Sequence, residues 1–449
     1  MRMESRTIIF HIDVNSAFLS WSAAYRTEVL GEKTDLRTVP SIVGGDQETR
    51  HGIVLAKSTP AKKYGIQTGE PIVAARKKCP NLIIIPPDFP VYVEKSKALI
   101  ALLKRYSDQV VQYSIDEAWA DFTGYEMLYG DPVVFAHKLK DIIKEELKFT
   151  VNIGVSSNRL LAKMAGDFKK PDLVHTLFPE EIEEKMWPLP VERLFLVGKA
   201  AADKLHSLGI YTIGDLARTD VNTLKAHMKK HGEVIWNYAW GREEENSMEE
   251  KPSMEKKPSM EETPVAREGN KVYGNSMTTP VNVTDVEYAR QILLSLSETV
   301  GMRLRADQAK ISCVSITLRS SDFVNRNRQM QLISATDVTE EIYAAACRLY
   351  DELWDGRPLR LIGVSTSRVS YEEYRQYNLF DQGKYDKLEK CDKAIDSIRA
   401  RFGEDSVMRA SFLNSRISHT GGGLNKEKRA EAVSGSGREK KKNGKGEIN

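Results

Sequence analysis

Apolar and polar residues recur along the N-terminal part of the chain with two different periods. Residues 8–14 form a mainly apolar run typical of a buried strand, whereas 16–29 and 132–147 show helical periodicity. Further strands are predicted at 110–114, 118–122 and 150–155. Together these elements predict an α/β domain over residues 1–177.

The strand pattern stops near residue 178. Residues 178–242 carry short helical patterns separated by glycine turns, which predicts a small all-α unit. A compact α+β domain is predicted over residues 271–371. The elements expected in it are strands at 311–319 and 359–369 and helices at 285–305 and 339–354. The chain is therefore multidomain, with α/β and α+β parts.

Three segments lack the pattern of a packed domain. Residues 243–270 are acidic, rich in proline and contain Ser-Met-Glu three times, which predicts a low-complexity linker. Residues 372–420 form a C-terminal extension, and 421–449 are predicted to be a disordered basic tail.

Composition narrows the function classes. Lys plus Arg is 66 and Asp plus Glu is 63, so the net charge of +3 indicates no partner by itself. The four cysteines form no CxxC pair, which argues against a zinc knuckle or a disulfide framework. We find no signal peptide and no apolar run of about 18 residues, so we expect a cytoplasmic protein with no membrane segment.

Acidic residues stand where apolar strands end. Asp13 closes the first strand, directly before a helix whose backbone N–H groups are free to bind an anion. Asp116 and Glu117 lie between two apolar strands, where burial without a cation would be costly. If the strands pair, three carboxylates can hold two divalent cations for nucleotidyl transfer. Without this context, an Asp-Glu pair usually marks a hairpin turn.

Two motifs carry a family resemblance. Asp13-Val-Asn-Ser-Ala-Phe18 and Ser114-Ile-Asp-Glu-Ala118 resemble the acidic motifs of Y-family translesion DNA polymerases of the DNA polymerase IV type. The resemblance covers about residues 7–412. It implies a right-hand polymerase with a ferredoxin-like palm, small fingers at about 31–89, a helix-hairpin-helix thumb and a separate little finger.

The resemblance also implies site residues. Asp13, Asp116 and Glu117 match the metal-binding carboxylates, with the Val14 carbonyl as a further ligand. The expected cofactor is Mg²⁺, two ions per site, with Mn²⁺ as a possible substitute. Phe18 falls at the sugar gate, where a ring would collide with a ribose 2′-hydroxyl. From the pattern alone it could also be a core residue.

Triphosphate contacts are implied for six residues. They are Ser16, Ala17, Phe18, Thr59, Lys62 and Lys170. Lys170 is expected at the end of a helix that Pro171 stops. Thr59 and Lys62 replace the Tyr and Arg of the family's fingers motif, which changes the geometry of the phosphate contact. Asn15 and Ala17 also depart from the commoner Asp and Phe. Taken singly, the two lysines could be ordinary solvated side chains.

DNA and clamp contacts are implied elsewhere. Gly198 and Lys199 fit the turn of a helix-hairpin-helix, although an ordinary helical hairpin is the alternative. Basic residues of the little finger are also expected to contact DNA: Arg319, Arg326 and Arg328. The segment containing Gln376, Leu379 and Phe380 resembles a peptide that binds the bacterial sliding clamp, or it could pack back on the little finger.

The function predicted is template-directed, low-fidelity DNA synthesis past lesions, as a monomer acting on primer-template DNA and deoxynucleoside triphosphates. Two alternatives stay open. Gly44-Gly-Asp-Gln-Glu resembles a turn of cyclic-dinucleotide synthases. Departures at Asn15, Ala17 and Thr59 would also suit a clamp-tethered DNA-binding factor whose site has decayed.

Overall fold

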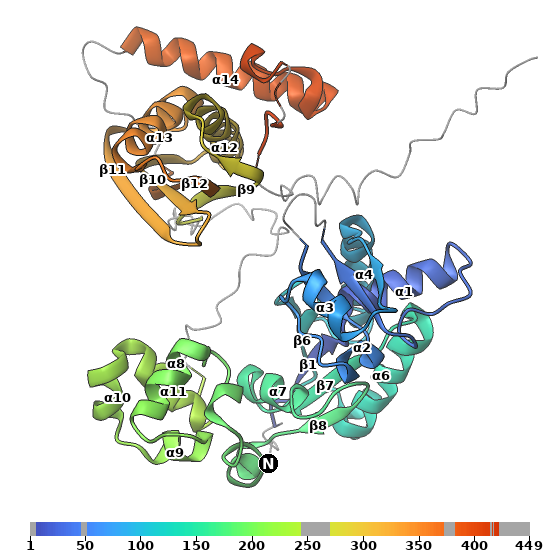
Figure 1. Ribbon diagram of the computed structural model, residues 1–449. Helices are drawn as coiled ribbons and strands as arrows, with labels where there is room; N and C mark the ends of the chain where they lie inside the picture. Colours follow the sequence, from blue (N-terminus) through green and yellow to red (C-terminus); the bar gives the residue numbers. More distant parts are fainter. Residues whose placement is uncertain are drawn as a thin grey trace, which may run out of the picture. The chain divides into compact units, whose positions relative to one another are not determined.

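The computed structural model describes residues 6–45, 52–243, 270–371, 382–413, 415 and 417–421. The described residues fall into two compact units, one ending at residue 243 and one starting at residue 270. Figure 1 shows the first unit in blue to green and the second in yellow to red.

A five-stranded sheet, in the order β5-β6-β1-β7-β8, forms the centre of the first unit. Its strands are β1 (Ile9–Val14), β5 (Val110–Gln112), β6 (Glu117–Asp121), β7 (Val151–Ser156) and β8 (Val174–Thr176). Strand β1 is central and runs antiparallel to both neighbours. It is therefore buried along its whole length.

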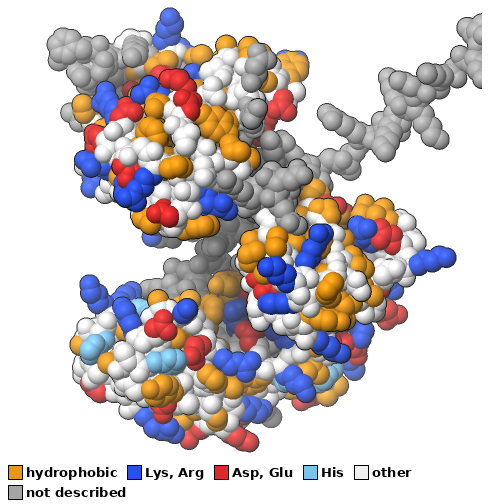
Figure 2. Space-filling model, in the orientation of Figure 1, with side chains coloured by type: hydrophobic (Ala, Val, Ile, Leu, Met, Phe, Trp, Pro, Cys, Tyr) orange, Lys and Arg blue, Asp and Glu red, His pale blue; other side chains and the backbone are white. Residues whose placement is uncertain are grey.

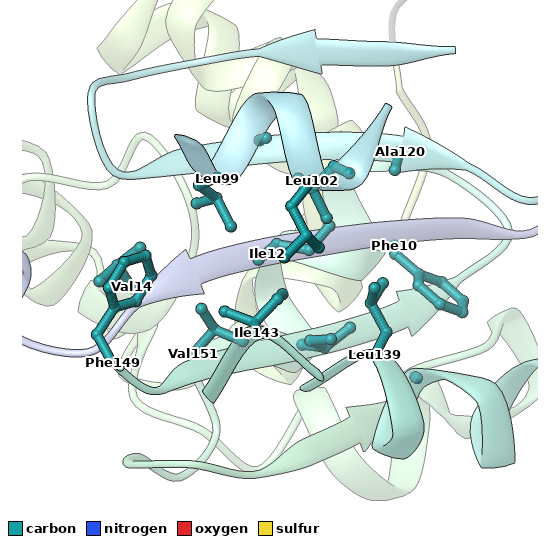
Figure 3. Close-up of a cluster of buried hydrophobic side chains, with 14 of the residues drawn as sticks. Phe10, Ile12, Val14, Leu99, Leu102, Ala120, Leu139, Ile143, Phe149 and Val151 are labelled. Carbon is teal, nitrogen blue, oxygen red and sulfur yellow. The ribbon is translucent and has the colours of Figure 1, made fainter. Parts of the chain in front are cut away.

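The two faces of this sheet have different partners because side chains alternate along each strand. Phe10, Ile12 and Val14 point to one face, where they pack with residues of α4 (Phe89–Leu103) and α6 (Pro132–Leu147), as Figure 3 shows. His11 and Asp13 point to the opposite face. Helix α7 (Arg159–Gly166) packs against β7 and β1. Gly154 permits this approach, since a Cβ there would lie 1.9 Å from the Ala162 carbonyl oxygen.

A second, smaller sheet has the strand order β3-β2-β4 and a hydrophobic core of its own. Its strands are β2 (Ser41–Gly44), β3 (Val54–Lys57) and β4 (Ile83–Ile85), and its helices are α2 (Thr59–Lys63) and α3 (Ile72–Lys78). Helix α1 (Ala17–Glu28) precedes it. Strands of three or four residues are too short to show a period, so the pattern of the sequence did not predict them.

Short helices complete the first unit around a separate core. The small helix α5 (Glu126–Tyr129) comes earlier, directly before α6. The region after β8 begins with the short helical segments η1 (Pro179–Glu181), η2 (Ile182–Met186) and η3 (Val191–Arg193). It continues with the helices α8 (Lys199–Ser207), α9 (Ile213–Arg218), α10 (Val221–Met228) and α11 (Lys230–Ala239). The prediction of an all-α region beyond residue 178 is therefore confirmed.

The second unit is an antiparallel sheet in the order β11-β10-β12-β9, covered by helices on one face (Figure 1). Its elements are β9 (Tyr273–Val283), α12 (Val286–Ala306), β10 (Lys310–Ser320), β11 (Asn325–Thr336), α13 (Thr339–Leu353) and β12 (Leu359–Ser370). Helix α14 (Gln382–Phe402) follows, and then the turns η4 (Glu404–Ser406) and η5 (Ala410–Phe412). A buried ion pair between Glu298 and Arg399, 2.8 Å long, joins α12 to α14.

Candidate active site

Asp13 and Glu117 face each other at the end of the central strands. They are directly opposite in the β1–β6 register, so both side chains point to the same face of the sheet. Asp116 lies in the preceding turn, where its carbonyl accepts a hydrogen bond from the Val14 N–H (3.1 Å). The Ser114 hydroxyl donates to the Asp116 carboxylate at 2.7 Å. The fold thus brings Asp13 to the end of the sheet where Asp116 and Glu117, about a hundred residues further along the chain, also lie.

Two lysines pair with Asp13 and Glu117. Lys170 Nζ lies 2.5 Å from Asp13 Oδ2, and Lys163 Nζ lies 2.5 Å from Glu117 Oε2. His11 Nε2 is 3.4 Å from the same Glu117 oxygen. Within the described part of the chain, no three His, Cys, Asp or Glu side chains are already arranged around one ion position. The ammonium groups are thus the cations that pair with Asp13 and Glu117 in this structure.

The two opposing carboxylates differ in their electrostatic balance. Burial raises the pKa of Asp13 more than the Lys170 ammonium lowers it, and the nearby Glu117 charge raises it further. Burial also acts to raise the pKa of Glu117, but His11 and Lys163 together bring it down to about 2. Burial likewise opposes the charge of Lys170, whose pKa is nevertheless raised because both Asp13 and Asp167 pair with it.

Asp13 is therefore a buried acid whose negative charge is only partly balanced. Its pKa is raised although Lys170 pairs with it, so this lysine, which Asp167 shares, does not offset the cost of burying the charge. Additional positive charge beside it would be favourable, and carboxylate oxygens are the donors that hard divalent cations prefer. The residues present thus fit a divalent metal ion.

A pocket of about 150 Å³ opens beside Asp13. It brings together six of the residues that the sequence singled out: Asp13, Val14, Ser16, Thr59, Lys62 and Lys170. Thr59 and Lys62 come from α2, while Lys170 comes from the loop after α7. Arg37 also lines this pocket, so three positive side chains and an acid surround it, as a nucleoside triphosphate with its metal ions requires.

The first turn of α1 borders the same pocket. Ser16 precedes the helix in a left-handed conformation (φ 49°), and its side chain makes no capping hydrogen bond to that turn. The lining of the pocket includes Ser16 but neither Ala17 nor Phe18. Phe18 instead stacks on Tyr92, with ring centroids 4.5 Å apart and planes 6° from parallel.

Comparison with known proteins shows to which family the chain belongs. The model of the impB/mucB/samB family matches residues 12–167, its helix-hairpin-helix motif matches 179–210, and its C-terminal domain matches 270–379. The chain is 44% identical to DNA polymerase IV of Clostridium acetobutylicum over 406 residues, covering 90% of this chain and 98% of that protein.

The chain belongs to the DNA polymerase IV group of the Y-family. DNA polymerase IV of Acetivibrio thermocellus is 35% identical, over 92% of this chain and 98% of its own length. The solved structure of a Y-family DNA polymerase chimera aligns with a TM-score of 0.63 at 22% identity, covering 81% of this chain and all of that chain (100%). The predicted palm, fingers, thumb and little-finger architecture is confirmed.

As a member of this family, the chain is a translesion DNA polymerase that depends on divalent metal ions and uses DNA and nucleotides as substrates. Neither alternative is favoured. Gly44, which begins the turn that resembles a cyclic-dinucleotide synthase, ends β2 in the small sheet rather than in the sheet that carries Asp13.

One local prediction about the Y-family site was wrong. The sequence suggested that the helix before Lys170 continues to that lysine, but α7 ends at Gly166. The buried Asn152 amide donates to the backbone carbonyls of Gly166 and Lys169, which diverts the chain from helical pairing. Lys170 therefore extends from a loop, not from a helix end.

Two further residues of the site escaped the sequence reasoning. Lys163 lies on α7, is only 8% exposed and contacts Glu117. His11 is fully buried beneath the same carboxylate. The signal for Lys163 was a single lysine within the apolar stretch Leu-Leu-Ala-Lys-Met-Ala, because a buried lysine requires an acidic partner.

The thumb of this polymerase has an unusual turn. Gly198 is the residue before α8, and Lys199 begins that helix, with both exposed to solvent. The first of the two expected helices is reduced to the short turn η3, and the left-handed residue of the hairpin is Leu196 (φ 69°), not the glycine. Gly198 leaves the first N–H groups of α8 without a side-chain cap.

The three little-finger arginines do not lie together. Arg319 points to the open face of the sheet, where it donates to Asn325 (2.7 Å). Arg326 and Arg328 stand opposite the buried Leu318 and Ile316 on the edge strand β11, so they point to the helical side. There they pair with Asp355 (2.6 Å) and Glu352 (2.9 Å), respectively. Side chains alternate along both paired strands, so Arg319 of β10 lies on the other face from Arg326 and Arg328 of β11.

Charge is dispersed over the visible surface. Figure 2 shows Lys and Arg side chains interspersed with acidic and hydrophobic ones on both units. The clamp motif, with Gln376, Leu379 and Phe380, lies outside the described residues, as do most of the linker and the basic tail. None of the described helices is long and apolar enough to span a bilayer.

Proposed function

We propose that Asp13, Asp116, Glu117 and the Val14 carbonyl hold two Mg²⁺ ions, or Mn²⁺ in their place, and that the chain extends a DNA primer at this site. The observation that carries the proposal is the direct opposition of Asp13 and Glu117 in the β1–β6 register, with Asp13 lining a pocket that Lys62 and Lys170 also line. When bound, the ions would activate the primer 3′-oxygen and offset charge on the departing pyrophosphate.

The chain's own residues bind and orient the deoxynucleotide. Lys62 and Lys170 place ammonium groups against the triphosphate, and the uncapped N–H groups at the start of α1 add donors at Ser16, Ala17 and Phe18. Thr59 supplies a hydroxyl from the same pocket wall. In this scheme the carboxylates act as ligands, not as acids or bases.

Lys170 changes partner during this cycle. In the free enzyme its ammonium balances Asp13 and Asp167. Once Asp13 serves as a metal ligand, the ammonium turns to the triphosphate, which lies along the same pocket. The lysine thereby keeps the acid from being an unpaired buried charge before substrate arrives.

DNA contacts are assigned more broadly. The exposed start of α8, with Gly198 and Lys199, offers N–H groups and a cation to one phosphate of the primer-template. Arg319 contacts DNA from the open face of the little-finger sheet, where its side chain lies. To contact DNA as well, Arg326 and Arg328 must first break their exposed ion pairs, and breaking such pairs costs little free energy.

We further infer that the polymerase works as a monomer in the cytoplasm and binds the bacterial sliding clamp. Gln376, Leu379 and Phe380 supply the polar and apolar anchors of a clamp-binding peptide.

Primer extension tests the proposed chemistry. Wild type and Asp116→Ala are given primed template, single deoxynucleotides and Mg²⁺. We expect template-directed extension by the wild type and a loss of at least about a thousandfold in the variant, as for removal of a major electrostatic group. Product formed from nucleotide without a primer would instead support the cyclase, and no product from either protein would support the DNA-binding factor.

A further inference from the structure

Asn152 is a fully buried amide near the start of β7 with every hydrogen-bonding position used. Its Oδ1 accepts from Asn15 Nδ2 at 3.1 Å and from the Leu173 N–H at 3.4 Å. Its Nδ2 donates to the carbonyls of Gly166 (3.1 Å) and Lys169 (2.7 Å). An asparagine side chain has two donor hydrogens and an oxygen with two lone pairs, so none is left over.

These partners enclose the loop that carries Lys170. Gly166 ends α7, and Lys169 and Leu173 flank the lysine on either side. Asn15 adds a second tie, because its Oδ1 accepts from the Asp172 N–H at 2.9 Å. The loop between α7 and β8 is thus fastened by two side-chain amides to the strands beneath it.

Asn152 also lies directly opposite Asp13 in the β1–β7 register. Its side chain therefore shares a face with the carboxylate that Lys170 contacts. One amide thus connects the strand that neighbours the metal-site acid to the loop that supplies the phosphate-binding cation. Removing it would take this donor from the Gly166 carbonyl and leave the Lys169 carbonyl only the His175 ring at 3.0 Å, so the loop would lose its tie to β7.

We propose that Asn152, supported by Asn15, is a positioning residue that fixes Lys170 at the pocket and thereby sets the affinity for the deoxynucleoside triphosphate. The inference rests on the proposed contact between Lys170 and the triphosphate. Asn152 itself touches no substrate, since it is covered by β1 and the loop.

The same geometry gives a reason for the amide at position 15, where the family more often has Asp. Asn152 presents its oxygen to Asn15. A carboxylate there would face that oxygen with no donor between them. Turning the Asn152 amide round would forfeit both of its bonds to the loop carbonyls. Asn15 and Asn152 are therefore matched to each other.

Steady-state kinetics with a double-mutant cycle tests this inference. Asn152→Ser, Lys170→Ala and the double variant are compared, with Asn222→Ser on the exposed surface of α10 as the matched control. We expect Asn152→Ser and Lys170→Ala each to raise the KM for deoxynucleotide about tenfold or more, with a smaller change in kcat and in DNA affinity. The control should behave as the wild type.

The double variant separates positioning from mere support of the fold. If Asn152 acts through Lys170, its effect on KM largely disappears once the lysine is gone, so the two changes are not additive. Full additivity, or a normal KM in Asn152→Ser, would overturn the inference while leaving the role of Lys170 intact. A normal KM in Lys170→Ala would overturn the proposed triphosphate contact and this inference with it.

The milder variant Asn15→Asp covers the case in which Asn152→Ser does not fold. It keeps the acceptor for the Asp172 N–H, removes the donor to Asn152 and adds a negative charge to the pocket. We expect it to raise the KM in the same direction. An Asn15→Asp enzyme with wild-type KM would contradict the matching of the two amides.

Discussion

Glu117 and Asp13 show how two opposing carboxylates acquire different properties from their neighbours. Glu117 has both a lysine and a histidine beside it, whereas Asp13 shares Lys170 with Asp167. The pKa of Glu117 is accordingly lowered and that of Asp13 raised. Asp13 is therefore the less compensated of these two acids.

The lowered pKa of Glu117 predicts a dependence of stability on pH. Its folded pKa of about 2 lies below the ordinary 4.5, so its stabilisation is complete above pH 4.5 and disappears as the pH falls towards 2. At about 1.4 kcal/mol per pKa unit, this amounts to at most about 3 kcal/mol. We expect Lys163→Met to raise the pKa of Glu117 and so to reduce the loss of stability as the pH falls.

Carboxyl NMR titration and denaturant unfolding at several pH values measure that change. The exposed Lys138→Met serves as the matched control. A Glu117 pKa that stays near 2 without Lys163 would show that His11 alone sets it.

Phe18 provides a test of sugar selection. Its ring stacks on Tyr92, which fixes its orientation beside the start of α1. Phe18→Ala should lower discrimination against ribonucleotides by at least about tenfold, since it removes the ring that would meet the 2′-hydroxyl. Tyr92→Phe keeps the stacking partner and should retain selection. Unchanged discrimination in Phe18→Ala, measured by single-nucleotide incorporation, would refute the gate assignment.

At the scale of elements, the sequence predicted what a local period can reveal. The strands β1 and β10 and the helices α6 and α12 are long enough to show their period, and they occur close to where the sequence placed them. The end of α7 could not be predicted, because a side chain from β7 determines it. Motif residues such as Asp13 could likewise be predicted from the local sequence, whereas Lys163 becomes part of the site only through tertiary packing.

Helix α14 was not predicted either, and its attachment to the second unit can be tested. Arg399 is buried against Glu298, which also pairs with Arg409. Arg399→Met should destabilise the chain by about 3 kcal/mol, because it leaves a buried carboxylate undercompensated. Arg401→Met on the same helix is the matched control, and thermal unfolding reports both. If adding Glu298→Leu to Arg399→Met recovered no stability, the ion pair would not be the cause.

At the scale of the whole molecule, the clamp motif lies outside the described residues, and its role stays a prediction. We expect Leu379→Ala with Phe380→Ala to reduce clamp-stimulated synthesis about tenfold or more, while unstimulated synthesis is unchanged, because apolar anchors dominate such peptide contacts. Ile333→Ala, which alters a 93% exposed apolar residue of the second unit, is the control. Equal stimulation of both variants would show that the motif is structural.

The central claim is that Asp13, Asp116 and Glu117 together hold divalent ions. Anomalous scattering from Mn²⁺ in a crystal with primer-template and a non-reactive deoxynucleotide analogue tests it most directly. We predict two Mn²⁺ peaks, each within about 2.5 Å of oxygens from these carboxylates. Peaks bound elsewhere, or a site in which Lys163 and Lys170 still cover the acids, would contradict the account.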